Sequence, residues 1–368
     1  MGKNNIGIDG YWMTGQFRGM GRFAWQLVAS LRKECIAFYP KKRTDSGDLK
    51  CIELIYSPFP IWEQIQLPFA IKKNKIDVMI YPYNTGPLIK FEKKRVIVIH
   101  DLIFFKNNKE LPHSASIYQN IGRYYRRLMT GLNIKKADVI ITVSEFTKLE
   151  ICSTFNINPN NIIVIPNALS DHWYGIEENS SVCNENYIFT VAGDAPSKNL
   201  KRLLSAFSKL VKDNTTLRLK IAGVKRSKHK YYSDICQELD IINNVDFLGY
   251  ISIDELKGLY KNAKGFIFAS LFEGFGIPLI EAMASRIPIA YSKSTSLPEI
   301  ANGYGICFDP YSIQEIYEAL LILTTKDAYP MNDIQRAYEH SLQYKRNVVD
   351  SKVIQTFAKF YQFDDGIK

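Results

Sequence analysis

Short apolar runs alternate with longer amphipathic segments along the whole chain. The runs of the first half are NIGIDG, CIAFYP, DVMIYPY, RVIVIHD, DVIITVSE and NIIVIPN. Those of the second half are YIFTVAGD, LRLKIAG, VDFLGY, GFIFAS and IPIAYS. Runs rich in Ile and Val with little internal alternation are typical of strands buried on both faces, and the segments between them supply helical crossovers. The pattern therefore predicts the α/β class, with two Rossmann-like, doubly wound parallel sheets.

A lapse in this pattern marks the expected domain boundary. Between Pro166 and Asn186 the apolar periodicity stops, and Asn, Ser and Glu collect. After residue 331 the pattern becomes wholly helical, long enough for two helices. A chain of 368 residues fits two domains of ordinary size. We expect a first domain over residues 1–170, a second over 171–345, and a C-terminal helix within 346–368 that packs back on the first.

The composition is that of a soluble globular protein, with 46% hydrophobic and 23% charged residues. No apolar run approaches the ~20 residues of a membrane-spanning helix, and the N-terminus leads straight into a strand-like segment. We therefore expect a cytoplasmic location. The six cysteines are scattered, without a CxxC pair, so neither a zinc site nor a disulfide framework is indicated.

The net charge of +10 lies in the first half of the chain. Residues 1–167 carry 24 Lys and Arg against 13 Asp and Glu, whereas the remainder carries 23 against 24. Such a basic half can meet nucleic acid, an anionic membrane or an acidic substrate, or can be a solvated lysine-rich face. The basic, aromatic helix SIYQNIGRYYRRLMTGLNIKKAD, with Arg123, Arg126 and Arg127, can bind a membrane interface or pack its tyrosines inward.

The stretch Leu271–Ala284, LFEGFGIPLIEAMA, places glycines where a strand gives way to a helix. Pro278 stands where a first helical position is expected. The free amides and positive dipole end of a helix N-terminus form an anion site, and Gly274 and Gly276 let the backbone come close to the bound group. A diphosphate fits this description.

Two carboxylates, Glu273 and Glu281, flank the helix start; they suit vicinal hydroxyls, although acidic residues also simply favour a first helical turn. With its surroundings, ISIDELKGLYKNAKGFIFASLFEGFGIPLIEAMASRIPIAYSKSTSLPEIANGYGICFDP, the stretch resembles the E-x7-E donor region of retaining family-4 glycosyltransferases of GT-B fold. The resemblance implies that Glu273 contacts the donor hexose and Glu281 the ribose, with Gly274, Phe275 and Gly276 near sugar and phosphate. It also implies two domains facing a central cleft, the first on the acceptor side and the second binding the donor.

Upstream, VAGDAPSKNLKRLLSAF predicts a strand, a turn and an amphipathic helix, with Lys198 at the turn. This segment is similar to the family's glycine-to-Arg-Lys-Asn turn, whose basic side chains hold the diphosphate. The resemblance implies that role for Lys198, as a point charge. Ser197 stands where the arginine is usual, and Lys225 or Arg226 is a candidate substitute.

The first domain has a glycine-rich turn in GYWMTGQFRGMGRFAWQLVASL. It lacks the G-x-G-x-x-G order, and the next strand ends in lysines where a dinucleotide site needs an acid, so NAD binding is not indicated. The family has a comparable loop over the donor phosphates or on the acceptor side, which makes Gly19, Gly21 and Arg22 candidates for the cleft, and we expect them to bind the donor.

The run RVIVIHDLIFF puts His100 and Asp101 directly at the carboxyl end of a strand. A lone histidine is often a satisfied structural residue. The pair nevertheless matches the family's His-Asp at the same place, which implies that the histidine lies beside the reacting sugar. His100, Asp101 and Glu273 are therefore the catalytic candidates.

The resemblance implies a metal-independent, retaining transfer of a hexose from a nucleoside-diphosphate sugar. The segments WEQIQLP, PYNTGP and HDLIFF look like those of mannosyl- or rhamnosyl-transferring members, so GDP-mannose is the first choice of donor. The expected acceptor is a cell-surface polysaccharide, such as O-antigen, or a lipid-linked oligosaccharide, with peripheral contact at the inner face of the plasma membrane through the basic first domain. We expect no cofactor besides the nucleotide sugar, no metal and no nucleic acid. The alternatives are a GT-B sugar-nucleotide epimerase and a non-catalytic nucleotide-sugar-binding subunit.

Overall fold

A computed structural model describes residues 5–13, 19–31, 35–41, 50–106, 117–174, 185–212, 214–325 and 327–361. Part of the glycine-rich turn (14–18), Cys183 and the end of the expected 346–368 helix lie outside the described residues. The chain divides into two compact units. One comprises the described residues up to Ala168 together with those from Arg346 onward, and the other comprises Leu169–Lys345.

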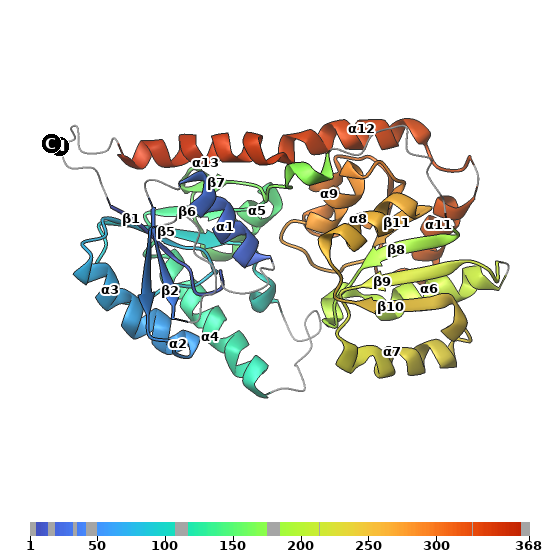
Figure 1. Cartoon of the computed structure of the whole chain (residues 1–368), viewed down its shortest axis with the longest axis horizontal. Helices are drawn as coiled ribbons and strands as arrows, with labels where there is room; N and C mark the ends of the chain where they lie inside the picture. Colours follow the sequence, from blue (N-terminus) through green and yellow to red (C-terminus); the bar gives the residue numbers. More distant parts are fainter. Residues whose placement is uncertain are drawn as a thin grey trace. The chain divides into compact units, whose positions relative to one another are not determined.

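A seven-stranded sheet forms the centre of the first unit (Figure 1). Its order is β3-β2-β1-β4-β5-β6-β7, and every neighbouring pair is parallel. The order reverses between β1 and β4, where doubly wound sheets have the crevice that holds ligands. The strands are β1 (Ile6–Asp9), β2 (Cys35–Pro40), β3 (Cys51–Leu54), β4 (Val78–Tyr81), β5 (Lys94–Ile99), β6 (Val139–Thr142) and β7 (Ile162–Val164).

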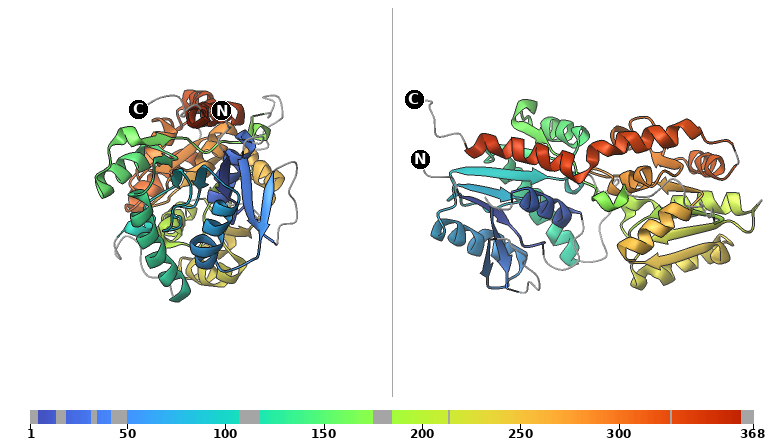
Figure 2. Two further views of the ribbon diagram at one scale, coloured as in Figure 1. Left: turned by 90° about the vertical axis from the view of Figure 1, so that its left-hand side faces the viewer. Right: turned by 45° about the horizontal axis from the view of Figure 1, so that its top comes forward.

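Helices before and after these strands supply the crossovers. They are α1 (Met20–Ser30), the continuous run α2 (Phe59–Ile61), η1 (Trp62–Gln66) and α3 (Leu67–Lys73), the turn η2 (Ile103–Phe105), α4 (Ile117–Ile134), α5 (Glu145–Phe155) and the turn η3 (Pro159–Asn161). The chain's last helix, α13 (Arg346–Tyr361), packs beside α1 (Figure 2). Arg346 donates to the backbone carbonyl of Gln26 at 2.9 Å, and Ser30 donates to Asp350 at 2.7 Å. These hydrogen bonds attach α13 to α1.

The second unit is built on a six-stranded sheet of order β10-β9-β8-β11-β12-β13, again with parallel neighbours. Its strands are β8 (Tyr187–Val191), β9 (Arg218–Ala222), β10 (Val245–Gly249), β11 (Gly265–Phe268), β12 (Ile289–Ser292) and β13 (Ile306–Phe308). The helices are α6 (Leu200–Val211), α7 (Arg226–Glu238), α8 (Ile253–Asn262), α9 (Ile277–Ala284), α10 (Leu297–Ala301), α11 (Ile313–Thr324) and α12 (Met331–Ser341). Short turns are η4 (Asp171–Trp173), η5 (Pro196–Lys198), η6 (Ile242–Asn244) and η7 (Leu342–Tyr344).

Burial explains why the apolar runs form strands. Val96, Ile97, Val98 and Ile99 of β5 are all fully buried, so helices cover both faces of the strand. In the second unit, the inward side chains of α6 and α11 meet those of the sheet in one continuous apolar core. The prediction of two doubly wound parallel sheets is confirmed.

The apolar pattern does not predict two edge strands. β3 reads CIEL and is only half-buried, and β13 has three residues with Cys307 exposed. Edge strands lie against one neighbour only, so their sequences carry less of the apolar signal that marks a central strand.

Candidate functional site

Hydroxyl groups at the end of β12 and just after it hold the loop between β11 and α9 in place. Ser292 donates to the backbone carbonyl of Ser270 at 2.5 Å, and Ser294 donates to that of Leu271 at 2.5 Å. Buried carbonyl groups need such partners, because an unpaired one costs about as much as a lost hydrogen bond. The first half of this loop is thereby fixed to the end of β12 and the residues that follow it.

The same segment fixes the second half of the loop. The backbone N–H of Glu273 donates to the hydroxyl of Thr295 at 3.0 Å. The buried hydroxyl of Ser296 lies 3.0 Å from the carbonyl of Glu273 and 2.7 Å from that of Phe275, so its single O–H is shared between the two. The backbone on either side of the Glu273 side chain therefore has little freedom to move.

Lys198 and Glu273 form an ion pair at the carboxyl edge of the sheet. The Lys198 Nζ lies 2.5 Å from the Glu273 Oε1, and the side chains are 29% and 16% exposed. Their two loops are also joined through the backbone, because the N–H of Leu271 donates to the carbonyl of Ser197 at 2.7 Å. The ammonium group lies 5.7 Å from the centre of the Phe268 ring. The structure thus brings together two candidates that are far apart in the sequence.

Gly276 precedes α9 as its N-cap, with φ of 118° and no side-chain cap. A Cβ at this position would lie 2.6 Å from Leu297, so a glycine is required by packing as well as by the backbone conformation. Pro278 is the second residue of α9, one position later than predicted. Phe275 is buried and packs its ring edge-on against Tyr344, with 5.6 Å between the ring centres. Its side chain is therefore part of the core, and its backbone carbonyl is the group that contacts the Ser296 hydroxyl.

Glu281 lies one turn inside α9 and is only 3% exposed. Its Oε2 lies 3.1 Å from the hydroxyl of Tyr260, which lies equally far from the carbonyl of Pro278. The Tyr260 ring is itself held edge-on against Phe189 and Trp173. The sequence reasoning missed Tyr260, because it belongs to α8 and gives no local signal of a contact with α9.

Asn199, next to Lys198, anchors the turn before α6. It has φ of 58°, and its side-chain amide donates to the carbonyls of Ala269 (3.0 Å) and Pro310 (2.7 Å). This buried side chain links the turn to the ends of two strands. Among the suggested substitutes for the missing arginine, Lys225 lies 3.6 Å from Asp194 in an ion pair.

His100 lies at the carboxyl end of β5 in the first unit and is buried. Its Nε2 lies 2.9 Å from the carbonyl of Pro82; since a carbonyl only accepts, the ring is protonated at Nε2. Burial lowers the pKa of His100 to about 4, so the imidazole is neutral at neutral pH. The ring packs edge-on against Phe23 of α1 at 5.1 Å. The Asn84 side chain accepts from the His100 backbone N–H at 2.7 Å and donates to the carbonyl of Asp101 at 3.3 Å.

The described glycine-rich residues lie at the start of α1. Gly19 is the N-cap, with φ of 42°, and Gly21 is buried within the helix. Arg22 is exposed. The neighbouring Phe23 is the residue that contacts His100, so these candidates lie next to one another within the first unit.

A buried acidic network in the first unit escaped the sequence reasoning. Asp9, at the end of β1, accepts from the indole N–H of Trp62 at 3.0 Å. The adjacent Glu63 is hydrogen-bonded to the hydroxyls of Thr85 and Tyr125. Burial raises the pKa of Asp9 to about 7, and it also raises the pKa of Glu63. The segments WEQIQLP, PYNTGP and HDLIFF, noted separately in the sequence, are therefore connected in space through these bonds and those of Asn84.

The candidate residues fall into two groups, one in each unit. Glu273, Gly274, Phe275, Gly276 and Glu281 share one loop and helix, and Lys198 contacts that loop directly. Among the described residues, no three His, Cys, Asp or Glu side chains are placed to hold a metal ion. None of the described helices combines the length and the apolar character needed to cross a membrane.

Comparisons with known proteins agree with this arrangement. The model for Glycosyltransferase Family 4 matches residues 17–172, and that for Glycosyl transferases group 1 matches residues 176–340. The chain is 27% identical over 247 residues to O-antigen chain mannosyltransferase B of Escherichia coli, covering 64% of this chain and 63% of that protein. It is 26% identical over 257 residues to O-antigen chain mannosyltransferase RfbU of Salmonella typhimurium, covering 70% and 67%. The match thus spans slightly less than two thirds of the first relative's length.

A solved structure shows the same fold. HepE of Anabaena, crystallised with UDP and glucose, superposes with a TM-score of 0.73 over 96% of this chain and 99% of that chain, at 14% identity. The two consecutive family models cover most of the chain, and each corresponds to one parallel-sheet unit. The chain belongs to glycosyltransferase family 4 and has the GT-B fold.

Proposed function

We propose that this protein transfers a hexose from a nucleoside-diphosphate sugar, GDP-mannose by first choice, to a glycan acceptor with retention of anomeric configuration. The observation that carries the proposal is the Lys198–Glu273 ion pair, set on a rigid loop directly before an uncapped helix N-terminus. The mannosyltransferases among its relatives support mannose, and the O-antigen function in their names supports a cell-surface polysaccharide acceptor.

The ion pair suits a site that receives a diphosphate sugar. Lys198 and Glu273 neutralise one another across a distance of 2.5 Å. When the donor arrives, the ammonium group of Lys198 turns to the phosphate and the carboxylate of Glu273 becomes free to accept from sugar hydroxyls. Glu281, already oriented by Tyr260, is assigned to the ribose hydroxyls.

Charge development in the reaction explains why these groups accelerate it. As the glycosidic bond breaks, the departing diphosphate gains negative charge and the anomeric carbon gains positive charge. The ammonium group of Lys198, once turned to the diphosphate, and the N-terminal amides of α9 interact most strongly with the phosphate in that transition state. The leaving phosphate is then the group placed to take the proton of the attacking acceptor hydroxyl, on the same face of the sugar.

For the first unit we propose an acceptor-side role. His100 is neutral, and its Nε2–H is committed to Pro82, so we assign to it contact with the sugar and no proton transfer. Asp101, Gly19, Gly21 and Arg22 complete the candidates of this unit. Arg22 is exposed at the start of α1, where its cationic side chain can attract an anionic substrate group.

The first unit also has a surface suited to a lipid-linked acceptor. On α2–α3, the exposed apolar residues follow one face, and α4 has a second such row beside it, joined through the Gln64–Tyr125 hydrogen bond. These residues are Ile61, Ile65, Phe69, Ile121, Tyr124 and Leu128. Exposed Lys72, Lys73 and Arg127 lie on the same helices. Apolar rows flanked by cations are typical of helices that lie on anionic lipid surfaces, so we propose peripheral contact with such a membrane.

A thermal-shift panel with GDP, UDP, dTDP and ADP tests the donor site. A nucleotide at a hundred times its dissociation constant should stabilise the fold by about 2.7 kcal/mol. We expect one of the diphosphates, with GDP as the first choice, to raise the melting temperature.

Lys198→Met should weaken the binding of that nucleotide about tenfold, because the phosphate loses its cation. Lys220→Met is the matched control, since Lys220 also pairs with a glutamate, Glu185, and lies over an aromatic ring. An equal loss of nucleotide affinity in both variants would contradict the assignment of the donor site. No change in melting temperature with any nucleotide would contradict it too.

An activity assay separates transfer from the alternatives. The protein is incubated with the donor identified above, first alone and then with a lipid-linked oligosaccharide acceptor, and the products are followed by NMR. Transfer predicts an extended acceptor whose new linkage keeps the donor's anomeric configuration, only in the second mixture. An isomerised donor in the first mixture would identify an epimerase, and an unchanged donor in both would identify a binding subunit.

Co-sedimentation with vesicles tests the membrane surface. Wild-type protein should sediment with phosphatidylglycerol vesicles and much less with phosphatidylcholine vesicles. Phe69→Ser combined with Leu128→Ser should lower the bound fraction severalfold, because each removes a large exposed side chain from the apolar rows. Ile253→Ser combined with Met331→Ser, which removes two exposed apolar residues of the second unit, serves as the control. Equal binding of both double variants to the phosphatidylglycerol vesicles would refute the proposed membrane contact through this surface.

A further inference from the structure

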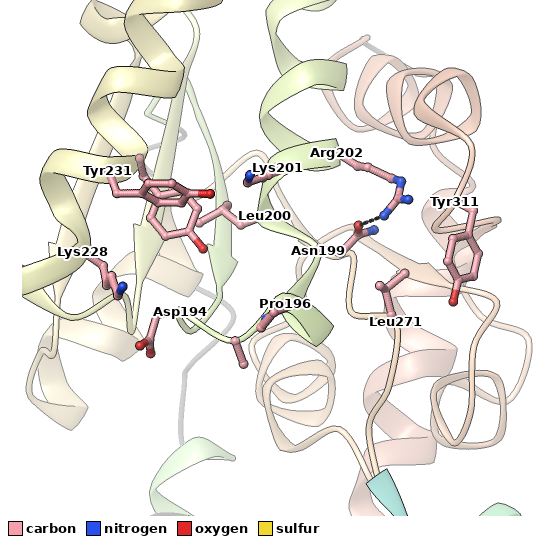
Figure 3. Close-up of a pocket in the computed structure, with 12 residues that line it drawn as sticks. Asp194, Pro196, Asn199, Leu200, Lys201, Arg202, Lys228, Tyr231, Leu271 and Tyr311 are labelled. Atoms are coloured by element: carbon pink, nitrogen blue, oxygen red, sulfur yellow. Dashed lines mark hydrogen bonds between the residues drawn. The ribbon is translucent and has the colours of Figure 1, made fainter. Parts of the chain in front are cut away.

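The second unit contains a pocket of about 500 Å³ beside the first turn of α6. Its walls come from α6, α7, the segment after β8, and the residues Leu271 and Tyr311 (Figure 3). Neither the ion pair of Lys198 and Glu273 nor Glu281 lines it. The volume falls in the range of pockets that hold small ligands in proteins. The proposed donor site therefore does not account for this pocket.

The charges in the pocket favour an anion. Lys201, Arg202 and Lys228 line it together with one acid, Asp194. That acid is already paired with Lys225, at 3.6 Å. Between residues that the structure describes, none of the three lining cations forms an ion pair. Three such cations around one hollow repel one another, and a bound anion relieves that repulsion.

Aromatic rings in the walls favour a ligand with a ring of its own. Tyr231 and Tyr311 are 46% and 57% exposed, each beside a cation. The Lys201 Nζ lies 5.1 Å from the centre of the Tyr231 ring, and the Arg202 guanidinium lies 5.3 Å from that of Tyr311. Figure 3 shows Tyr231 and Tyr311 on opposite sides of the pocket. A tyrosine offers an apolar ring face for packing and a hydroxyl for hydrogen bonds, which suits a pyranose.

The Arg202 side chain is pre-oriented by its neighbour. Its Nη1 donates to the side-chain oxygen of Asn199 at 2.9 Å, shown as a dashed line in Figure 3. Asn199 is itself held by two backbone carbonyls at the ends of strands. A guanidinium fixed in this way keeps further N–H groups for a ligand and loses little side-chain freedom on binding.

We infer that this pocket is a second carbohydrate site, separate from the donor site, for a sugar that carries a phosphate or carboxylate group. The anionic group lies among Lys201, Arg202 and Lys228, and the sugar ring packs on the tyrosines. Two sources share this chemistry, namely an anionic residue of the growing glycan and a free sugar phosphate.

Binding by isothermal titration calorimetry tests the pocket. The probes are mannose 6-phosphate, glucuronate and neutral methyl mannoside, with the full chain. We expect the two anionic sugars to bind and the neutral one to bind at least tenfold more weakly. Lys201→Ala combined with Lys228→Ala should weaken the anionic sugars at least tenfold. The control is Lys209→Ala combined with Lys230→Ala, exposed lysines of the same two helices that do not line the pocket, and it should leave their affinity unchanged.

The outcomes separate this site from the donor site. Retained nucleotide binding by the Lys201/Lys228 variant, with loss of sugar binding, supports a distinct site and shows that the unit is folded. The inference would be overturned if GDP and mannose 6-phosphate competed for binding. It would also be overturned if both double variants lost anionic-sugar affinity equally, or if the anionic sugars did not bind. A glucuronate-containing oligosaccharide that binds more tightly than glucuronate indicates the glycan as the source, whereas tighter binding of mannose 6-phosphate indicates a free sugar phosphate.

Discussion

The hydrogen bonds from the Ser292–Ser296 segment to the loop before α9 are the constraint on which the site depends. Neighbouring parallel strands end at the same edge of the sheet, so the loops after β11 and β12 must lie side by side. Every polar backbone group that they bury needs a partner. The hydroxyls of this segment meet that need, and they hold the backbone of Glu273 on both its N–H and carbonyl sides.

Rigidity in this loop bears on the proposed role of the ion pair. Lys198 and Glu273 are partly exposed side chains, and the Glu273 backbone is held by hydrogen bonds, so the exchange of partners that we propose for donor binding needs only side-chain rotation. Backbone groups held in this way stabilise a transition state without a cost of reorganisation during the reaction. The packing of Gly276 against Leu297 serves the same end, because it fixes where α9 begins.

The sequence was sufficient for the fold, and local patterns also supplied the residues that we propose for the donor site. Continuous apolar runs identified the central strands, and the E-x7-E stretch identified the loop. Contacts between distant segments were not predictable. The pairing of Lys198 with Glu273 spans 75 residues, and the support of Glu281 by Tyr260 spans 21. The buried carboxylate of Asp9 was missed because a strand-ending aspartate carries no sign of its partner, Trp62.

Calorimetric titration of Ser296→Ala with GDP and UDP tests the central claim most directly. This change removes the hydroxyl that reaches the carbonyls of Glu273 and Phe275 and leaves every proposed donor contact in place. Ser341→Ala, which also removes a buried hydroxyl bonded to a backbone carbonyl, controls for general destabilisation. If the hydroxyls build the site, Ser296→Ala weakens the better nucleotide about tenfold, near 1.4 kcal/mol, and Ser341→Ala does not. Wild-type affinity in Ser296→Ala would contradict the account.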